Sequence, residues 1–282
     1  MLRSKTSIIL LITTLYHASG DYIARNAALG MHDYWLTPNL CHELTVSFTG
    51  STLYNHCLGH NVRARLPPTI NPDPKPFSTW VAPPPGWFYG NWKATYTSQP
   101  AYFSMQNMQY DFSPVFPQST STPGRNNDIT SFQLANQSTV FTAYGIDTPR
   151  RSKDPSLGPE WDAVYDFTGM GALATVTNTW QIIAWGYDTL GDGYLVLYET
   201  PVAATGASSG LDIESRSENG PSLETLIRIY SVLTALGNEE LTGLVYSMEK
   251  QVVDGRRSGT PPVQCDIACV NNTGLPPGII LW

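Results

Sequence analysis

The sequence predicts a mainly β protein whose strands are followed by a short pair of α-helices. Between residues 90 and 216, short runs of β-branched and aromatic residues alternate with turns that contain Gly and Pro. Charged residues make up only 14% of the 282, which suits strands and turns better than long solvated helices. A helical spacing of apolar residues begins only after residue 221.

The first twenty residues predict a secretory signal peptide, residues 1–20. Arg3 and Lys5 precede the apolar run 8–12, and small residues follow it, so we expect cleavage before Asp21. The apolar run is too short to span a bilayer, and no later stretch is long enough. We therefore expect a secreted, extracellular protein without a membrane span. Its formal net charge of −7 and its lack of a basic stripe argue against nucleic acid as a partner.

Two flanks surround the predicted strands. Residues 21–86 show little periodicity and become Pro-rich in their second half, which predicts an extended connector. Residues 251–282 form a polar tail that ends rich in Pro and Gly. An even cysteine count in a secreted chain predicts two disulfides, and the sequence leaves all three pairings open. The cysteines are Cys41, Cys57, Cys265 and Cys269.

A metal site is the alternative for the first two cysteines. The histidines beside them are His42, His56 and His60. Their spacing follows no regular zinc pattern, and an oxidising compartment favours disulfides, so we expect no metal. No cofactor is expected either. Two N-glycosylation triplets, at Asn136 and Asn271, agree with secretion.

The predicted strands follow one another at close spacing. Gly90 admits a close approach of backbones, and the β-favouring residues after it continue a strand. The segments 169–171 and 191–193 each contain two glycines and predict tight hairpin turns. About eight short strands of this kind predict a closed antiparallel barrel or a sandwich. The expected strands are 92–96, 105–112, 131–144, 161–167, 172–176, 180–187, 195–200 and 211–216.

Two helices are expected after the strands. Ser222 can serve as the N-cap of the first, whose apolar side chains recur at helical spacing as far as Leu233. Gly237 ends this helix, and Asn238 can cap a second, shorter one. We interpret the apolar stripe as packing against the β structure, in preference to a partner-binding face.

Several motifs carry a resemblance to a known family. They are Phe88-x-Gly90-x-Trp92, the run 109–112, and the succession of strands and amphipathic helix over residues 180–248. In these features residues 87–250 resemble the lipocalin domain of violaxanthin de-epoxidase and its relatives. The resemblance implies an eight-stranded antiparallel lipocalin-like barrel with C-terminal α-helices. The cysteine-rich N-terminal region of the plant enzymes and a plastid-targeting signal are both absent, so we expect a secreted, non-plastid relative.

The resemblance also implies a structural contact at the closed end of the barrel. In that family the Arg after the last strand packs on the Trp of the first strand. Here these residues are Arg216 and Trp92, with Gly90 beside them. A guanidinium stacked on an indole face stabilises by about 0.5–2 kcal/mol.

The catalytic positions of the family are altered in this chain. The Asp that precedes a strand Trp is replaced by Asn178. The two cavity-facing tyrosine positions fall on Glu199 and Glu214, with Tyr198 one residue away. Asn cannot shuttle a proton, so the acid–base mechanism of the family does not transfer intact. These four positions are the candidate ligand-binding residues.

The two glutamates suggest a hypothesis of their own. If strands 195–200 and 211–216 are antiparallel neighbours, Glu199 and Glu214 would lie opposite each other on the cavity face. Two close carboxylates in a low-dielectric pocket cannot easily both ionise, so one pKa should rise. Such a pair could act as acid and base or hold a cationic ligand. The alternative is a register slip of one residue, which would send both side chains to solvent.

These observations predict a secreted lipocalin-like protein that binds a small, largely apolar ligand inside its barrel. The alternative is an enzyme. It would be either a violaxanthin de-epoxidase-like oxidoreductase or isomerase with an altered site, or an acid–base catalyst that uses Glu199 and Glu214. A third class, a secreted interaction protein that uses its loops, has only loop length to support it.

Overall fold

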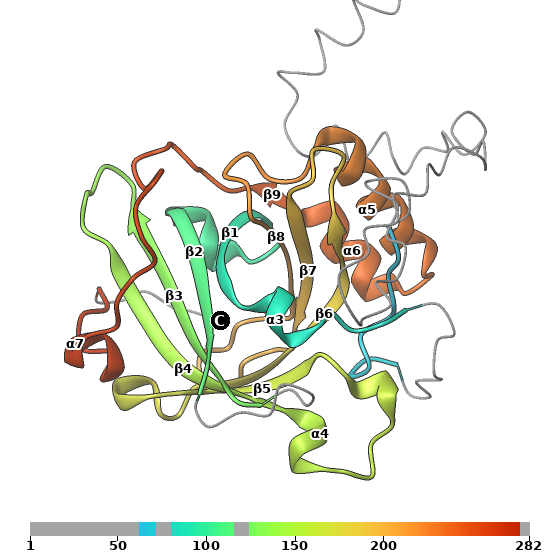
Figure 1. Ribbon diagram of the computed structural model, residues 1–282, viewed down its shortest axis with the longest axis horizontal. Coiled ribbons are helices and arrows are strands. Elements are labelled where there is room, and N and C mark those ends of the chain that lie inside the picture. Colours follow the sequence, from blue (N-terminus) through green and yellow to red (C-terminus); the bar gives the residue numbers. More distant parts are fainter. Residues whose placement is uncertain (1–61, 72–79, 116–123, 277–282) are drawn as a thin grey trace, which may run out of the picture.

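The computed structural model of the chain describes residues 62–71, 80–115 and 124–276 (Figure 1). The expected signal peptide lies outside these residues. Cys41, Cys57 and the histidines beside them lie outside as well.

Eight antiparallel strands form a barrel in which each strand pairs with its neighbour in chain order. The sheet closes because β1 pairs with both β2 and β8 (Figure 1). A two-residue strand, β9 (Glu249–Lys250), pairs with the end of β1. The closed antiparallel barrel of the prediction is thereby confirmed. Its strands are β1 (Gly90–Thr97), β2 (Met105–Pro114), β3 (Asn126–Leu134), β4 (Phe141–Pro149), β5 (Val164–Gly169), β6 (Thr177–Tyr187), β7 (Gly193–Glu199) and β8 (Gly210–Ser215).

Two of the predicted strands are wrong. The segment 131–144 is not one strand, because a turn in which Asn136 takes a φ of 62° divides it between β3 and β4. The segment 172–176 contains a short 3₁₀ helix, Gly171–Leu173, where Gly171 has a φ of 52°. Asn and Gly adopt this left-handed conformation at low cost, and it interrupts a strand.

The two helices after the barrel begin at the predicted caps. The Ser222 hydroxyl accepts a hydrogen bond from the Thr225 N–H at the start of α5 (Leu223–Ala235). The Asn238 side chain accepts one from the Leu241 N–H at the start of α6 (Glu239–Ser247). Each cap satisfies a backbone donor that the helix itself leaves without a partner. The other helical segments are α3 (Pro85–Phe88), α4 (Arg150–Lys153), α7 (Ile267–Val270) and two 3₁₀ segments, Pro100–Ser104 and Pro159–Trp161.

Two apolar cores lie on the two faces of the same strands. One lies inside the barrel, and the other lies between the barrel wall and the helices α5 and α6. On β7 the pleat divides them, since Leu195 belongs to the inner core and Val196 to the outer one. The outer core includes Ile213 of β8 and Leu233 of α5, both fully buried. Burying a side chain of this size stabilises by about 1.5–3 kcal/mol, so the apolar stripe packs on the barrel as predicted.

Arg216, directly after β8, joins the last strand to the first. Its guanidinium lies over the Trp92 ring, with Cζ 3.6 Å from the ring centroid. It also donates hydrogen bonds to the backbone carbonyls of Asn91 and Tyr89, at 2.7 and 2.8 Å. Gly90 has a φ of 110°, and a Cβ there would lie 3.0 Å from the guanidinium, which explains the glycine. The Arg–Trp contact implied by the resemblance is present.

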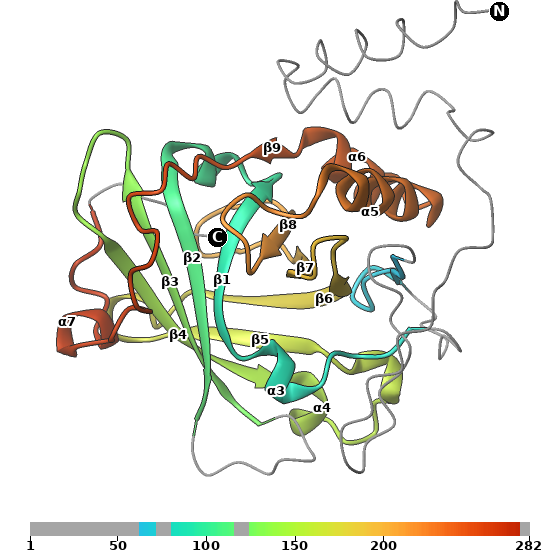
Figure 2. The ribbon, with the colours of Figure 1, turned by 45° about the horizontal axis from the view of Figure 1, so that its top comes forward.

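The described parts of both flanks pack against the barrel. On the N-terminal side, the Arg65 guanidinium lies 3.7 Å from the Trp80 ring centroid and donates to the Asp162 carbonyl at 2.7 Å. On the C-terminal side, the tail runs along the outside of β2 to β4 as far as α7 (Figure 2). There the Asn272 amide donates to the Tyr144 carbonyl at 2.8 Å.

The tail contains the one disulfide found among the described residues. Cys265 and Cys269 are bonded, with their Cα atoms 5.2 Å apart. This is one of the pairs that the sequence left open. The two expected glycosylation residues, Asn136 and Asn271, are both exposed.

Candidate ligand-binding site

The inner face of β7 and β8 carries three acidic side chains. Glu199 ends the inward-facing series of β7. On β8, Asp212 and Glu214 alternate with Leu211 and Ile213, which belong to the outer core. All three acids are buried, with 3% of Glu199 and none of the other two exposed. The strand pleat therefore directs these acids into the barrel.

The register of β7 and β8 corrects the hypothesis of a directly opposed glutamate pair. Glu214 lies opposite Leu195, whereas Glu199 lies opposite Gly210. Leu195 and Glu199 are four residues apart, which at the rise of a strand is about 13 Å. Asp212 lies between the two glutamates in this register. Asp212 was not named from the sequence, although it lies two residues before Glu214 and strand alternation alone places both on one face.

Asp212 accepts two side-chain hydrogen bonds. Thr97 Oγ1 donates to its Oδ1 at 2.5 Å, and the Tyr110 hydroxyl donates to its Oδ2 at 3.3 Å. Burial raises the pKa of Asp212 to about 7, although both hydrogen bonds act to lower it. Asp212 therefore gains or loses its proton close to neutral pH.

The two glutamates have fewer partners. Neither carboxyl oxygen of Glu214 has a hydrogen-bond partner among the described residues. Burial raises the pKa of Glu214 well above its usual range, Asp212 raises it further, and Arg216 opposes the rise. Burial and then Asp212 also raise the pKa of Glu199, whose hydrogen bond from Gln99 is 3.4 Å long.

Two more buried carboxyl groups lie on β3 and β4, across the barrel from β7 and β8 (Figure 1). Asp147 Oδ1 accepts a hydrogen bond from Trp180 Nε1 at 2.8 Å, and burial raises the pKa of Asp147 to about 8. Burial also raises the pKa of Asp128 well above its usual range, and Asp147 adds to the rise. One oxygen of each group, Asp128 Oδ1 and Asp147 Oδ2, has no hydrogen-bond partner among the described residues. These two acids complete the inner carboxyl cluster, which consists of Asp128, Asp147, Glu199, Asp212 and Glu214.

Sequence reasoning missed the two aspartates on β3 and β4. The alternation of side chains along a strand could have found Asp128. It lies two residues before Thr130, and Thr130 pairs with Tyr110, which belongs to the inner core. This alternation is readable only once Asn126–Leu134 is recognised as a separate strand.

Five aromatic rings pack against one another on the inner face of the barrel, beside the inner carboxyl cluster. Phe88 lies 4.4 Å from Phe112, and Tyr165 lies 4.4 Å from Trp180, between ring centroids. Phe112 and Trp180 join these pairs at 5.6 Å. Tyr110, which donates to Asp212, lies parallel to Phe112 at 6.1 Å. These five rings form what we call the aromatic wall.

The two remaining predicted ligand-binding residues, Asn178 and Tyr198, lie on opposite faces of the barrel wall. Asn178 lies on the inner face, and neither polar atom of its side chain has a hydrogen-bond partner among the described residues. The Thr130 hydroxyl likewise has no hydrogen-bond partner among the described residues. Tyr198 points the other way, because it alternates with Glu199, and its hydroxyl donates to Glu240 Oε1 of α6 at 2.8 Å. Tyr198 therefore does not contribute to the inner site.

In the part of the chain that the structure describes, no three His, Cys, Asp or Glu side chains are placed to hold a metal ion together. The helices described there include none that is long and apolar enough to cross a membrane.

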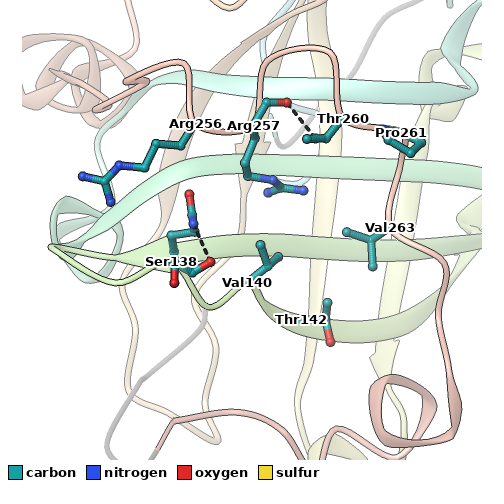
Figure 3. A pocket seen from close by; sticks show the side chains of 9 residues that line it. Ser138, Val140, Thr142, Arg256, Arg257, Thr260, Pro261 and Val263 are labelled. Atoms are coloured by element: carbon teal, nitrogen blue, oxygen red, sulfur yellow. Dashed lines mark hydrogen bonds between the residues drawn. The ribbon is translucent and has the colours of Figure 1, made fainter.

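A hollow of about 310 Å³ lies on the outside of the barrel between the strands β3 and β4 and the tail (Figure 3). Arg256 and Arg257 line it. Arg257 donates to the backbone carbonyls of Asn107 and Ser131, at 2.9 and 3.2 Å. Arg256 is paired with Asp254 at 3.0 Å and donates to the Gln137 carbonyl at 3.4 Å. Both guanidinium groups thus hold the tail in place, whereas the inner carboxyl cluster keeps unused hydrogen-bonding atoms.

Comparison with known proteins places the chain beside one curated relative. No protein-family model matches it. Among solved structures, apocrustacyanin C1 has a TM-score of 0.40 at 13% identity, over 62% of this chain and 79% of that one. H1 crustacyanin from the lobster Homarus americanus has a TM-score of 0.38 at 13% identity, over 58% of this chain and 76% of that one.

The curated relative is the botcinic acid biosynthesis cluster B protein 12 of Botryotinia fuckeliana. It is 31% identical over 198 residues, which cover 69% of this chain and 84% of the relative. The chain therefore belongs to the family of the botcinic acid biosynthesis cluster B protein 12.

Proposed function

We propose that the chain is a secreted, lipocalin-like relative of violaxanthin de-epoxidase that holds a small, largely apolar molecule inside its barrel. One observation carries this proposal. The inner face combines the aromatic wall with buried polar atoms that have no hydrogen-bond partner among the described residues.

The two parts of the inner face favour a ligand with two parts. Aromatic rings at 4.4 to 5.6 Å from one another offer flat apolar surface to the body of a ligand. A buried polar atom without a partner costs about 1–3 kcal/mol, and polar groups of the ligand would offset this cost. Glu214 and Asn178 supply four such atoms.

The name of the curated relative supports a role in small-molecule metabolism. That protein is named for a cluster that makes botcinic acid. By analogy, we expect the ligand of this chain to be a product or an intermediate of a biosynthetic pathway, carried or converted inside the barrel.

Three features support secretion and an oxidising compartment. They are the signal-like first twenty residues, the two exposed glycosylation triplets at Asn136 and Asn271, and the Cys265–Cys269 disulfide. Expression of the full chain in a eukaryotic host tests this part. We expect the protein in the medium with Asp21 as its first residue, and retention inside the cell with residues 1–20 intact would contradict it.

A second candidate function is acid–base catalysis, and Asp212 favours it. A carboxyl group with a pKa of about 7, held by Thr97 and Tyr110, is suited to take up and release a proton near neutral pH. If the chain is a catalyst, Asp212→Asn would abolish turnover of the extracted ligand, whereas a pure binder would show no turnover to lose.

Native mass spectrometry of the protein from a eukaryotic secretion host, followed by extraction of the bound molecule, tests the binding function. We expect one small molecule per chain. Replacing Trp180 in the aromatic wall by Leu should empty the barrel, whereas Tyr246→Leu on the outer surface should not. A bare protein mass, together with unchanged Trp fluorescence against a panel of apolar compounds, would contradict the proposal.

A further inference from the structure

The inner carboxyl cluster has an imbalance of charge. Among the described residues, none of the Lys and Arg side chains lies on the inner face with these five acids. Of the described cations, only Arg216 stabilises the charged form of any of them, and it acts on Glu214 alone. Arg216 is itself held by Trp92 and by backbone carbonyls at the end of the barrel. Buried carboxylates normally require a countercharge.

The cluster also has an imbalance of hydrogen bonding. Thr97 and Tyr110 donate to Asp212, and Trp180 donates to Asp147. Four carboxyl oxygens of the cluster still lack partners among the described residues, two on Glu214 and one each on Asp128 and Asp147, and the Thr130 hydroxyl and the Asn178 amide on the same face lack them too. When ionised, these carboxyl oxygens can accept hydrogen bonds and positive charge from a ligand.

We propose that the ligand in the barrel carries an ammonium group, which Glu214 and Asp212 bind while its apolar body lies on the aromatic wall. This inference rests on the proposed function and adds the chemical class of the ligand. An alkylammonium group supplies three N–H donors and one positive charge. Charge-assisted hydrogen bonds to carboxylates are about twice as strong as neutral ones, and aromatic faces attract cations.

Tyr110 connects the two halves of this site. Its hydroxyl donates to Asp212, and its ring lies parallel to Phe112 of the aromatic wall. Burial raises the pKa of Tyr110 well above its usual range, and the charges of Tyr102, Asp212, Glu199 and Glu214 add to the rise. An ammonium group beside Tyr110 would thus be within the field of several carboxylates.

Binding of an ammonium ion should depend on pH, because it requires ionised carboxyl groups. The titratable and charged groups around Asp212 are Tyr102 of the 3₁₀ segment before β2, Tyr110 of β2, Asp128 of β3, Glu199 of β7 and Glu214 of β8, and Arg216 acts on Glu214. These acids are protonated in the empty barrel at low pH. An ammonium ligand must displace their protons, so its affinity should increase as the pH rises.

Isothermal titration calorimetry with two matched probes tests the inference. The probes are 2-phenylethylammonium and its neutral counterpart 2-phenylethanol, titrated into the full-length protein at pH 6, 7 and 8 and constant ionic strength. We expect the amine to bind at least tenfold more tightly than the alcohol at pH 8, and at least tenfold more tightly at pH 8 than at pH 6. The alcohol should show no pH dependence over this range.

Charge-neutral variants locate the effect. Glu214→Gln should weaken amine binding at pH 8 at least tenfold and leave alcohol binding unchanged, whereas Glu249→Gln on the exposed strand β9 should change neither. Should Glu214→Gln fail to fold, Asp212→Asn replaces it with the same expectation. Equal affinities for the two probes, unaffected by these variants, would overturn the ammonium inference and leave the binding function standing. If neither probe binds and no molecule is extracted from the protein, both proposals fail.

Discussion

The two faces of β7 and β8 carry opposite chemistry. On the outer face, Val196 and Ile213 pack against α5 and α6, and the polar tip of Tyr198 finds a partner in Glu240. On the inner face, Asp212 and Glu214 are as deeply buried, yet Glu214 finds no partner among the described residues. The same two strands thus carry a satisfied structural face and an unsatisfied inner face, and the unsatisfied face is where a ligand would contribute most.

Truncating the outer face should cost the most stability. Leu233 of α5 is fully buried in the outer core, so Leu233→Ala should lower the free energy of unfolding by about 2–5 kcal/mol. Ile227 on the same helix is 42% exposed, and Ile227→Ala should cost less than about 1 kcal/mol. Urea denaturation followed by circular dichroism measures both. Equal losses would mean that α5 does not pack on the barrel as described.

Removing the Arg216 side chain, which joins the last strand to the first, should cause the next largest loss of stability. Arg216→Ala removes a cation–π contact with Trp92 and hydrogen bonds to the carbonyls of Asn91 and Tyr89. We expect a loss of about 2–4 kcal/mol, measured by the same denaturation experiment. Arg216→Lys should recover only part of it, because an ammonium cannot reproduce the planar fork of the guanidinium. Full recovery by Lys would show that charge alone matters there.

The inner face should make the protein less stable as the pH rises. The pKa of Asp212 is raised to about 7 and that of Asp147 to about 8, so between roughly pH 5 and 8 the folded chain binds more protons than the unfolded one. The free energy of unfolding should therefore fall with increasing pH, by about 1.4 kcal/mol per pH unit for each extra proton. Asp212→Asn should flatten this dependence. A stability that rises over the window would contradict the burial of these acids.

The smallest effect is expected at Tyr198. Tyr198→Phe removes its hydrogen bond to Glu240 and should lower the free energy of unfolding by about 0.5–1.5 kcal/mol. Ligand binding should not change, because Tyr198 faces the helices. Weaker binding in this variant would place Tyr198 in the site and break the contrast between the two faces.

The sequence predicted the barrel and the helix caps because these depend on local patterns, whereas the contact between Arg216 and Trp92 was implied by the resemblance. Ser222 and Asn238 are recognisable as caps from their position before apolar periodicity, and Arg216 was found through its place after the last strand. The resemblance implied that Glu199 and Glu214 face the cavity, and both lie on the inner face.

Some of the residues that sequence missed depend on long-range pairing. Asp128 and Asp147 lie beyond the ends of the predicted strand 131–144, where the pairing of β3 with β4 extends both strands. Register is set by the packing of the closed sheet, so the composition of one strand cannot supply it. Asp212 was not named, although it lies two residues before Glu214 and shares its face. Tyr198 was assigned to the site because it is next to Glu199, but adjacent residues of a strand face opposite sides of the sheet.

A carbon-detected NMR titration of protein labelled with ¹³C at the Asp and Glu carboxyl groups tests the central claim most directly. Asp212→Asn and Glu214→Gln assign the two resonances that matter. In the empty protein we predict that both titrate well above the ordinary range of about pH 4, and that a saturating ammonium ligand moves their titration to lower pH. If both carboxyl groups titrate near pH 4 with or without the ligand, the inner face is not a buried site in need of a countercharge, and the account is wrong.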